Sequence, residues 1–492
     1  MRARPLALVA GLCLWLASCA VTARGQDRAA PPPIAREFRA AWVATVNNID
    51  WPSRPGLSGA QARAELDAIV ARAAELGLNA LVFQVRPAGD AFYRSELEPW
   101  SEWLTGAQGR APDDDWDPLA FAIERCHRRG LQLHAWCNPY RAWHPSAKSK
   151  PSPDHVLARL PDACVRFGSL RWMDPGDERA VEWTLAVLSD IVARYDVDGL
   201  HLDDYFYPYP EQGASFADDA SYGRYRARGG KLGRSDWRRA NVDRFVQRVH
   251  TAVHEIKPWV QFGISPFGIA RPGVPKGIEA GIDQYEQLGA DVLRWLREGW
   301  VDYLSPQLYW PIDQRPQSFA VLLPWWLEQN PRRRHVWPGL DAGRMLERKP
   351  PSRRDELADQ LGLLRAALPR DPGFVLYSFR ALRDDAPHVG TTLRRELRGP
   401  ALAPATPWLG TVPPPPPVAR IELGDRHHTL RWTADGEARF VAVQVRSDGG
   451  WRTHAVLGAH NGAEALPADT KAVVVYAVSR TGQLSEPVWP RW

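Results

Sequence analysis

The stretch that decides the fold is Asp198-Gly-Leu-His-Leu-Asp-Asp-Tyr-Phe-Tyr-Pro-Tyr-Pro210. Its first half is typical of a short buried strand, and its second half carries two adjacent carboxylates and several aromatic residues. Side chains alternate along a strand, so Leu200 and Leu202 share one face while His201 and Asp203 share the other. A buried parallel strand usually has aliphatic side chains on both faces. The polar face therefore predicts a strand that looks into a barrel, near the end where catalytic groups gather.

Strand-like and helix-like segments alternate on both sides of this stretch. The other expected strands are 40–46, 80–86, 131–138, 260–265, 301–309, 335–340 and 374–379. One intervening helix begins with a capping-box pattern, Ser58 followed by Gln61, and ends at Gly77. Strict alternation indicates a parallel sheet. Eight such strand–helix units predict an α/β fold of the (β/α)₈ TIM-barrel type.

The amino-terminal segment has the pattern of an export signal. A basic start, Met1-Arg-Ala-Arg4, precedes a short apolar run from Leu6 to Ala17. The following Leu16-Ala17-Ser18-Cys19 resembles the bacterial lipobox, in which the cysteine is acylated and becomes the first residue of the mature protein. We expect a signal peptide at 1–19, lipidation of Cys19 and a small, polar, Pro-rich tether at 20–35. Because Ala20 is not aspartate, the anchor is expected to favour the outer membrane, facing the periplasm; an ordinary signal peptide is the alternative.

The rest of the chain divides by composition. Residues 36–398 hold the alternating pattern of the barrel, and 399–417, with five consecutive prolines, reads as a stiff linker. Residues 418–492 contain short alternating strands split by Gly and Asp turns. They predict a small β-sandwich similar to a fibronectin type III module, for which a binding role and a spacer role both stay open.

Composition narrows the class of partner. The net charge of +5 is spread without a dense Lys/Arg run, so it suits an anionic polymer but does not indicate nucleic-acid binding. The 23 tryptophans are either core residues or stacking surfaces for sugar rings. No nucleotide-binding, serine-hydrolase or zinc-protease motif is present, so we expect no cofactor and no metal. A zinc ion held by His134, His201 and Asp203 is the open alternative.

The same alternation test, applied to other strands, predicts a polar cavity. His134, Trp136 and Asn138 share one face of 131–138, and Gln307 and Tyr309 share one face of 301–309. Each strand becomes more polar towards its carboxyl end, as expected for a site at one end of a barrel. The candidate catalytic residues are Asp203, which points inward, and Asp204 beside it. The candidate substrate-binding residues are Arg86, Asp90, His134, Trp136, Asn138, Tyr140, His201, Tyr205, Gln307, Tyr309 and Trp310.

Glycosidic bonds are normally cleaved by two carboxylates, one acid and one nucleophile or base. Arg86, His134 and Asn138 are the expected neighbours that keep Asp203 ionised or bind sugar hydroxyls. The partner carboxylate stays open among Asp204, Asp90, Asp174 and Asp313, since Asp174 is equally suited to a helix N-cap and Asp90 to a turn.

Longer motifs resemble a known family. The segments Phe38-Arg-Ala-Ala-Trp-Val-Ala-Thr-Val46, Phe83-Gln-Val-Arg-Pro-Ala-Gly-Asp90, His134-Ala-Trp-Cys-Asn-Pro-Tyr140 and Asp302-Tyr-Leu-Ser-Pro-Gln-Leu-Tyr-Trp310 are similar to the glycosyl-hydrolase-like family 10 of bacterial exported proteins. The resemblance implies a (β/α)₈ barrel, and members are often lipoproteins with a trailing fibronectin-like domain. One member is associated with the cell-division machinery and cleaves peptidoglycan glycan strands that have lost their peptides. Separately, Asp198–Tyr205 is similar to a diverged chitinase motif, which leaves substrate assistance by an N-acetyl group open.

Three functions follow from these patterns. The first is a cell-envelope glycosidase that acts on peptidoglycan, with envelope or divisome proteins as possible partners. The second is a glycosidase for an exopolysaccharide such as poly-N-acetylglucosamine. The third is a glycan-binding lipoprotein without catalysis, which the missing second inward carboxylate favours.

Overall fold

The computed structural model describes residues 30–343, 355–383, 389–424 and 427–492. The chain divides into two units, Met1–Pro33 and Ile34–Trp492, and the second contains all the sheets of the described residues. The predicted signal peptide, Cys19 and most of the predicted tether lie outside the described residues. In the described part of the chain, every helix is too short or too polar to span a bilayer.

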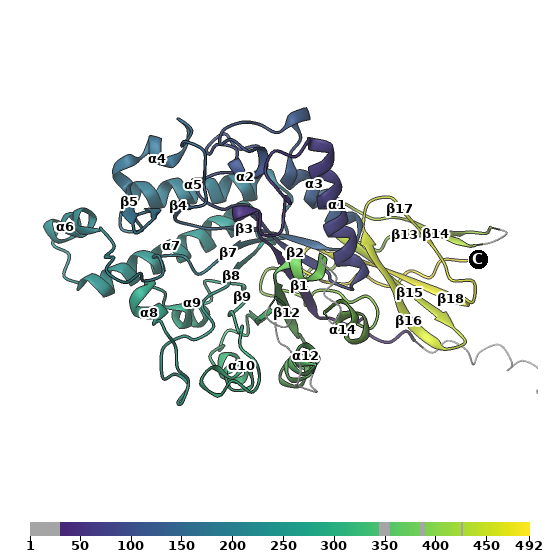
Figure 1. The fold of residues 1–492 in the computed structure, drawn as a ribbon. Coiled ribbons are helices and arrows are strands. Elements are labelled where there is room, and N and C mark those ends of the chain that lie inside the picture. The colour runs from purple at the N-terminus through teal and green to yellow at the C-terminus, as the bar shows by residue number, and fades with distance from the viewer. Residues whose placement is uncertain (1–29, 344–354, 384–388, 425–426) are drawn as a thin grey trace, which may run out of the picture. The chain divides into compact units, whose positions relative to one another are not determined.

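A parallel sheet of nine strands, in the order β10-β9-β8-β7-β3-β2-β1-β12-β11, forms the centre of the structure (Figure 1). Its edge strands β10 and β11 are consecutive in the chain, and a bridge between Gln307 and Gly339 links the region after β9 to β11. This arrangement is a TIM-barrel-like α/β fold. The strands are β1 Phe38–Val43, β2 Ala80–Arg86, β3 Gln132–Cys137, β7 Gly199–Leu202, β8 Gln261–Ile264, β9 Tyr303–Leu304, β10 His335–Val336, β11 Gly339–Asp341 and β12 Gly373–Tyr377.

Helices surround the sheet, as the predicted alternation requires (Figure 1). The capping box is confirmed: Ser58 and Gln61 bond reciprocally at the start of α1. Its bonds satisfy backbone N–H groups that a helix start otherwise leaves unpaired. The main helices are α1 Gly59–Glu75, α3 Pro118–Arg128, α5 Glu178–Arg194, α7 Arg234–Ile256, α9 Val292–Glu298, α10 Phe319–Glu328, α12 Glu356–Ala367, α13 Phe379–Arg383 and α14 Val389–Glu396.

Segments inserted after the strands carry further elements. A three-stranded antiparallel sheet, in the order β4-β6-β5, lies in the insert that follows β3 and was not predicted from the sequence. The inserted elements are α2 Glu102–Thr105, β4 Arg141–Trp143, α4 Val156–Arg159, β5 Cys164–Phe167, β6 Leu170–Met173, α6 Asp219–Ala227 and α8 Gln284–Gln287, with 3₁₀ turns η1 Val46–Asn48, η2 Asp113–Asp115, η3 Pro161–Ala163 and η4 Arg315–Gln317.

Large rings fill the inside of the sheet because glycines face them. A Cβ atom on Gly263 would lie 2.0 Å from the ring of Tyr303, and one on Gly339 would lie 2.9 Å from the ring of Trp42. Both distances are shorter than any real contact, so only glycine admits these rings. The resulting cluster also contains Phe38 and Trp337, whose rings are stacked at 3.9 Å. The interior is therefore packed rather than open below its carboxyl end.

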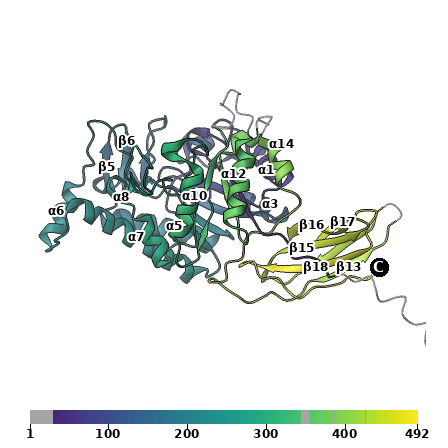
Figure 2. The same cartoon turned by 90° about the horizontal axis from the view of Figure 1, so that it is seen from below.

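The carboxyl-terminal residues form two small antiparallel sheets, β13-β14-β17 and β16-β15-β18 (Figure 2). Leu430 and Trp432 of the first sheet share one apolar cluster with Val443 and Val475 of the second. The strands are β13 Val418–Glu422, β14 Thr429–Thr433, β15 Ala438–Ser447, β16 Gly450–Gly458, β17 Gly462–Ala465 and β18 Ala472–Ser479.

The segment 399–417 before these sheets has no helix or regular strand. It packs closely nonetheless: Leu402 is buried, and the Trp408 indole donates a 2.8 Å hydrogen bond to Asp302, just before β9. Arg439 of β15 pairs with Asp196 and Asp198, which precede β7. The carboxyl-terminal sheets are thus tied to the amino ends of the barrel strands.

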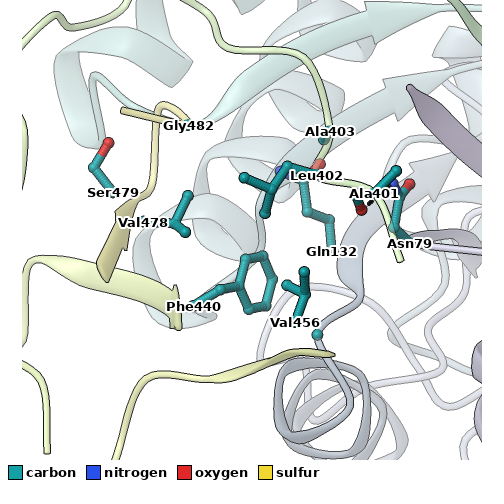
Figure 3. Close-up of a pocket in the computed structure, with 11 residues that line it drawn as sticks. Asn79, Gln132, Ala401, Leu402, Ala403, Phe440, Val456, Val478, Ser479 and Gly482 are labelled. Carbon is teal, nitrogen blue, oxygen red and sulfur yellow. Dashed lines mark hydrogen bonds between the residues drawn. The ribbon is translucent and has the colours of Figure 1, made fainter. Parts of the chain in front are cut away.

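A small hollow lies at the same end of the strands (Figure 3). Phe440, Val456 and Val478 of the carboxyl-terminal sheet line it, together with Gln132, the first residue of β3, and Asn79, whose amide donates to the carbonyl of Ala401. The predicted site residues follow the opposite, carboxyl ends of the strands. This hollow is therefore separate from the candidate site.

Candidate active site

Asp203 follows β7 and accepts hydrogen bonds from side chains at the end of β3. The Trp136 indole donates to it at 3.1 Å, and the Asn138 amide donates to its two oxygens at 3.2 and 3.1 Å. These contacts follow from the parallel register, which places Trp136 beside His201. The backbone N–H of Arg141 donates to the Asn138 oxygen at 2.8 Å and fixes the amide. Asp203, Trp136 and Asn138 thus form one hydrogen-bonded group at the carboxyl end of the barrel.

Asp204 lies beside Asp203 and accepts a short hydrogen bond from the Tyr209 hydroxyl. Burial, and then the neighbouring Asp203 charge, raises the pKa of Asp204 to about 7. Burial also raises the pKa of Asp203, against the Arg141 charge and the hydrogen bonds from Trp136 and Asn138. The two carboxyls are only 4% and 3% exposed, which explains both shifts. The pair can therefore hold a proton on Asp204 near neutral pH.

The two predicted histidines lie deeper inside the sheet than Asp203. One nitrogen of His201 and one of His134 lie 2.9 and 2.8 Å from the same hydroxyl, that of Tyr303. His201 also accepts from the Trp42 indole at 3.3 Å and lies 3.0 Å from the Ser265 hydroxyl. Burial lowers the pKa of both imidazoles, to about 4 for His134. Both rings are therefore neutral and engaged within the protein, below the carboxylates.

Arg86 is fully buried and binds Glu98 rather than Asp203. Its guanidinium donates to Glu98 at 2.8 Å and to the backbone carbonyls of Asn138 and Pro139 at 2.7 and 3.0 Å. Arg86 thus holds the turn that carries Asn138. The charge that acts on Asp203 instead belongs to Arg141, whose guanidinium lies 4.6 Å from the centre of the Tyr205 ring.

The other acidic candidates have structural partners of their own. Asp90 is buried and accepts from the backbone N–H of Ala88 at 3.1 Å, and burial raises its pKa to about 7. Asp174 accepts from Gly176 and Ser221 and is not a helix N-cap, because Asp177 caps α5. Asp313 is exposed in the loop after β9.

Aromatic side chains surround the carboxylates at the rim. Tyr205, Tyr309 and Trp310 are partly exposed, and the Tyr309 ring stacks on Tyr377 with centroids 5.6 Å apart. Trp310 meets Phe267 edge-on at 5.6 Å. These rings offer flat apolar surfaces beside polar groups, which suits a ligand with both kinds of surface.

Two further predicted residues differ in their surroundings. The Gln307 amide donates to the backbone carbonyl of Ser265 at 3.0 Å, and a hydrogen bond from Gln307 opposes the rise in the pKa of Asp204. Tyr140 is fully buried and packs on Phe245 of α7 at 5.0 Å, away from the inside of the sheet.

Arg141, Tyr209 and Tyr377 were missed from the sequence. Tyr209 lies within the opening stretch, and Arg141 directly follows the motif that ends at Tyr140. Tyr377 lies two residues after Val375, which faces the inside of the sheet, so alternation along β12 was a usable signal.

The predicted zinc alternative does not assemble, because the ligand atoms of His134 and His201 meet at Tyr303. In the part of the chain that is described, the group that could hold an ion is His250, His254 and Asp302, at the other end of the strands. Asp302 already accepts from Trp408, His254 and a backbone N–H.

The fold and site together define a TIM-barrel-like α/β protein with a buried carboxylate pair at the carboxyl end of its strands. A sequence model of the Glycosyl hydrolase-like 10 family matches residues 37–351, and the chain belongs to that family. It is similar to Glycosyl hydrolase YngK of Bacillus subtilis (38% identity over 407 residues, 80% of this chain and 78% of the relative). It is also similar to Glycosyl hydrolase DigH of Escherichia coli K12 (33% identity, 68% of this chain and 82% of the relative). Among solved structures, the glycoside hydrolase domain of PgaB from Bordetella bronchiseptica aligns at 13% identity and a TM-score of 0.44, over 73% of this chain and 99% of that domain.

Proposed function

We propose that this protein is a glycoside hydrolase that cleaves peptide-stripped glycan strands of peptidoglycan. The observation that carries the proposal is the Asp203–Asp204 pair, in which one carboxyl is surrounded by hydrogen-bond donors while the pKa of the other is raised to about 7. Two carboxyls whose environments separate their protonation states are the usual equipment for glycosidic cleavage. Family membership and two relatives named as glycosyl hydrolases support the same reaction.

In this mechanism Asp204 is the general acid. It gives its proton to the glycosidic oxygen as the bond from that oxygen to the anomeric carbon breaks. Asp203 is the ionised member of the pair in this mechanism, because Trp136, Asn138 and the Arg141 charge stabilise its negative form, and its charge stabilises the positive charge that develops on the sugar ring. The glycosidic oxygen takes the place of the Tyr209 hydroxyl on Asp204, because that hydroxyl covers the carboxyl in the free protein.

The partly exposed rings at the rim are proposed to bind the sugar. Tyr205, Tyr309 and Trp310 offer flat surfaces for the C–H faces of pyranose rings. The positive charge of Arg141, which is held against Tyr205, lies beside these rings and favours an anionic glycan. The net charge of +5 also favours an anionic polymer.

The proposed organisation completes the assignment. A signal peptide at 1–19 precedes a lipid-bearing Cys19 and a tether at 20–35, which place the enzyme in the envelope at the outer membrane. A closed (β/α)₈ barrel covers 36–398, a linker 399–417, and a fibronectin type III-like module 418–492. Mass spectrometry of the mature amino terminus tests the anchor: a diacylglyceryl group on Cys19 is expected, and an unmodified terminus elsewhere contradicts it.

The activity is tested with purified protein and peptide-stripped glycan strands, with products resolved by chromatography and mass spectrometry. We expect shortened strands from the wild type and a loss of about 10²–10⁴-fold for Asp204→Asn. Asp371→Asn is the matched control, because Asp371 is an exposed carboxylate at the amino end of β12. Turnover of poly-N-acetylglucosamine but not of peptidoglycan strands would show that the substrate is an exopolysaccharide. Binding to sacculi without turnover of any glycan would exclude catalysis.

A further inference from the structure

Asp341 ends β11 and points to the inside of the sheet. In this strand Gly339 faces inward, since a Cβ atom there would lie 2.9 Å from Trp42 and 3.2 Å from Tyr309. Leu340 packs in the core between sheet and helices. Side chains alternate along a strand, so Asp341 is on the same face as Gly339, one step closer to the carboxyl end. Its side chain is partly exposed.

The neighbours of Asp341 belong to the rim that surrounds Asp203 and Asp204. Asp341 is in register with Tyr377, whose ring stacks on Tyr309 at 5.6 Å. Burial raises the pKa of Tyr309, and the charges of Asp204 and Asp341 raise it further. Both carboxylates therefore lie close enough to act on this one phenol.

The two carboxylate positions come from different parts of the barrel. Asp203 and Asp204 follow β7, while Asp341 ends β11, and β10 and β11 are consecutive in the chain. In the sheet, β7 is separated from β10 by two strands, β8 and β9. It is separated from β11 by four strands, β3, β2, β1 and β12. A sugar bound over the end of the barrel would have Asp204 on one side and Asp341 on another.

We propose that Asp341 is a further catalytic carboxylate, which acts at the anomeric carbon while Asp204 protonates the leaving oxygen. This inference rests on the proposed glycosidase function. It supplies a carboxylate on another strand than the Asp203–Asp204 pair, which can act at the anomeric carbon while Asp203 stabilises the developing charge.

The reaction balances with one water molecule. The electron pair of the broken C1–O bond goes to the leaving oxygen, which receives the Asp204 proton. Asp341 either takes a proton from a water whose oxygen bonds to C1, or bonds to C1 itself and is later released by water that Asp204 deprotonates. In the first route a proton passes from Asp341 back to Asp204 through solvent. Both routes yield two shortened glycan ends, and the anomeric configuration of the product distinguishes them.

The test compares Asp341→Asn, Asp341→Ala and Asp204→Asn on peptide-stripped glycan and on an aryl glycoside of an N-acetylated disaccharide. We expect Asp341→Asn to lose about 10²–10⁴-fold on both substrates. Asp204→Asn should recover most activity on the aryl glycoside, because a good leaving group needs no proton. Sodium azide should restore turnover of the aryl glycoside by Asp341→Ala and yield a glycosyl azide of inverted configuration, which a merely structural role would not produce.

Unfolding midpoints in urea show whether each variant is folded, and Asp371→Asn is again the control. An active wild type with Asp341→Asn within 10-fold of it overturns the inference but leaves the glycosidase proposal in place. A folded Asp341→Ala that is inactive and gives no glycosyl azide also overturns it. If the wild type cleaves neither substrate, the proposed function itself fails.

Discussion

Replacing Arg439 by methionine removes the cation that ties β15 to the amino end of the barrel. The guanidinium lies 2.7 Å from an oxygen of Asp196, 2.9 Å from an oxygen of Asp198 and 3.0 Å from a ring nitrogen of His127. Asp198 and Arg439 are 6% and 7% exposed, so their pair is largely shielded from water. Methionine keeps much of the apolar volume of arginine, and the loss is mainly electrostatic.

The expected loss of unfolding free energy depends on which of the two ion pairs of Arg439, with Asp196 or with Asp198, is buried. Asp196 is partly open, with a side chain 46% exposed, so its share is about 0–1 kcal/mol. Removing one partner of a buried ion pair costs about 3–5 kcal/mol, because the other charge stays buried without compensation. His127 and the backbone N–H of Leu133 continue to bind Asp198 at 2.8 Å each. We therefore expect a loss near the lower end, about 3 kcal/mol of unfolding free energy at pH 7.

Urea unfolding followed by tryptophan fluorescence measures this loss, with Arg420→Met as control, since the Arg420–Glu422 pair is exposed. Burial alone would raise the pKa of Asp198, but the charges of Arg439 and His127 hold it at about 2, below its usual 3.8. A depressed carboxyl pKa stabilises the fold above the ordinary pKa and loses that effect as the pH falls. The difference between wild type and Arg439→Met should therefore be full at pH 7 and shrink between pH 3.8 and 2. A loss no larger than that of Arg420→Met at pH 7 would refute the reasoning.

Three further expectations are open to measurement. The kcat/KM of the wild type should fall as the pH rises through about 7, where Asp204 loses its proton. In Asp203→Asn, assayed through its residual activity, this fall should occur at lower pH, because the neighbouring negative charge is gone. If the fall occurs at the same pH in both proteins, the charge of Asp203 does not raise the pKa of Asp204. Gly263→Ala should lower the unfolding free energy in urea by about 1–3 kcal/mol or more, because its Cβ would lie 2.0 Å from a tyrosine ring. Gly362→Ala should raise the unfolding free energy slightly, because Gly362 lies within helix α12 and a Cβ there would meet no other atom. Equal effects of the two substitutions would contradict a packed interior. NMR should show that the His134 ring stays neutral down to about pH 4. The stability that depends on this neutral ring is therefore complete above pH 6.5 and is lost as the pH falls from 6.5 to about 4. Titration of the ring near pH 6.5 would show that it is exposed to water.

Periodicity and capping predicted the fold because both are local. The helix from Gly59 to Glu75 could be read from Ser58, Gln61 and one apolar stripe, and the structure matches. The small sheet β4-β6-β5 could not be read in this way. Its strands have three or four residues each, too few for a period to emerge from the sequence.

Alternation along a strand predicts which way a side chain points but not how deep it lies. It placed His134, Trp136, Asn138 and Asp203 on inward faces, and Trp136 and Asn138 do contact Asp203, whereas His134 does not. His134 lies four residues earlier on β3 and meets Tyr303 instead. Arg86 was also expected beside Asp203, but its partner Glu98 comes from a loop, and no strand pattern reports a contact of that kind.

The filled interior gives a physical reason for the chemistry at the rim. Gly263 and Gly339 admit the rings of Tyr303 and Trp42, and Asp203 is hydrogen-bonded to Trp136, which belongs to the same tightly packed cluster. A carboxyl against such a cluster is desolvated from one side, and desolvation is the first cause of the raised pKa of both Asp203 and Asp204. Desolvation, together with the negative charge of Asp203, thus raises the pKa of Asp204 to about 7. This desolvation needs small residues on some strands, so that large rings on the others exclude water.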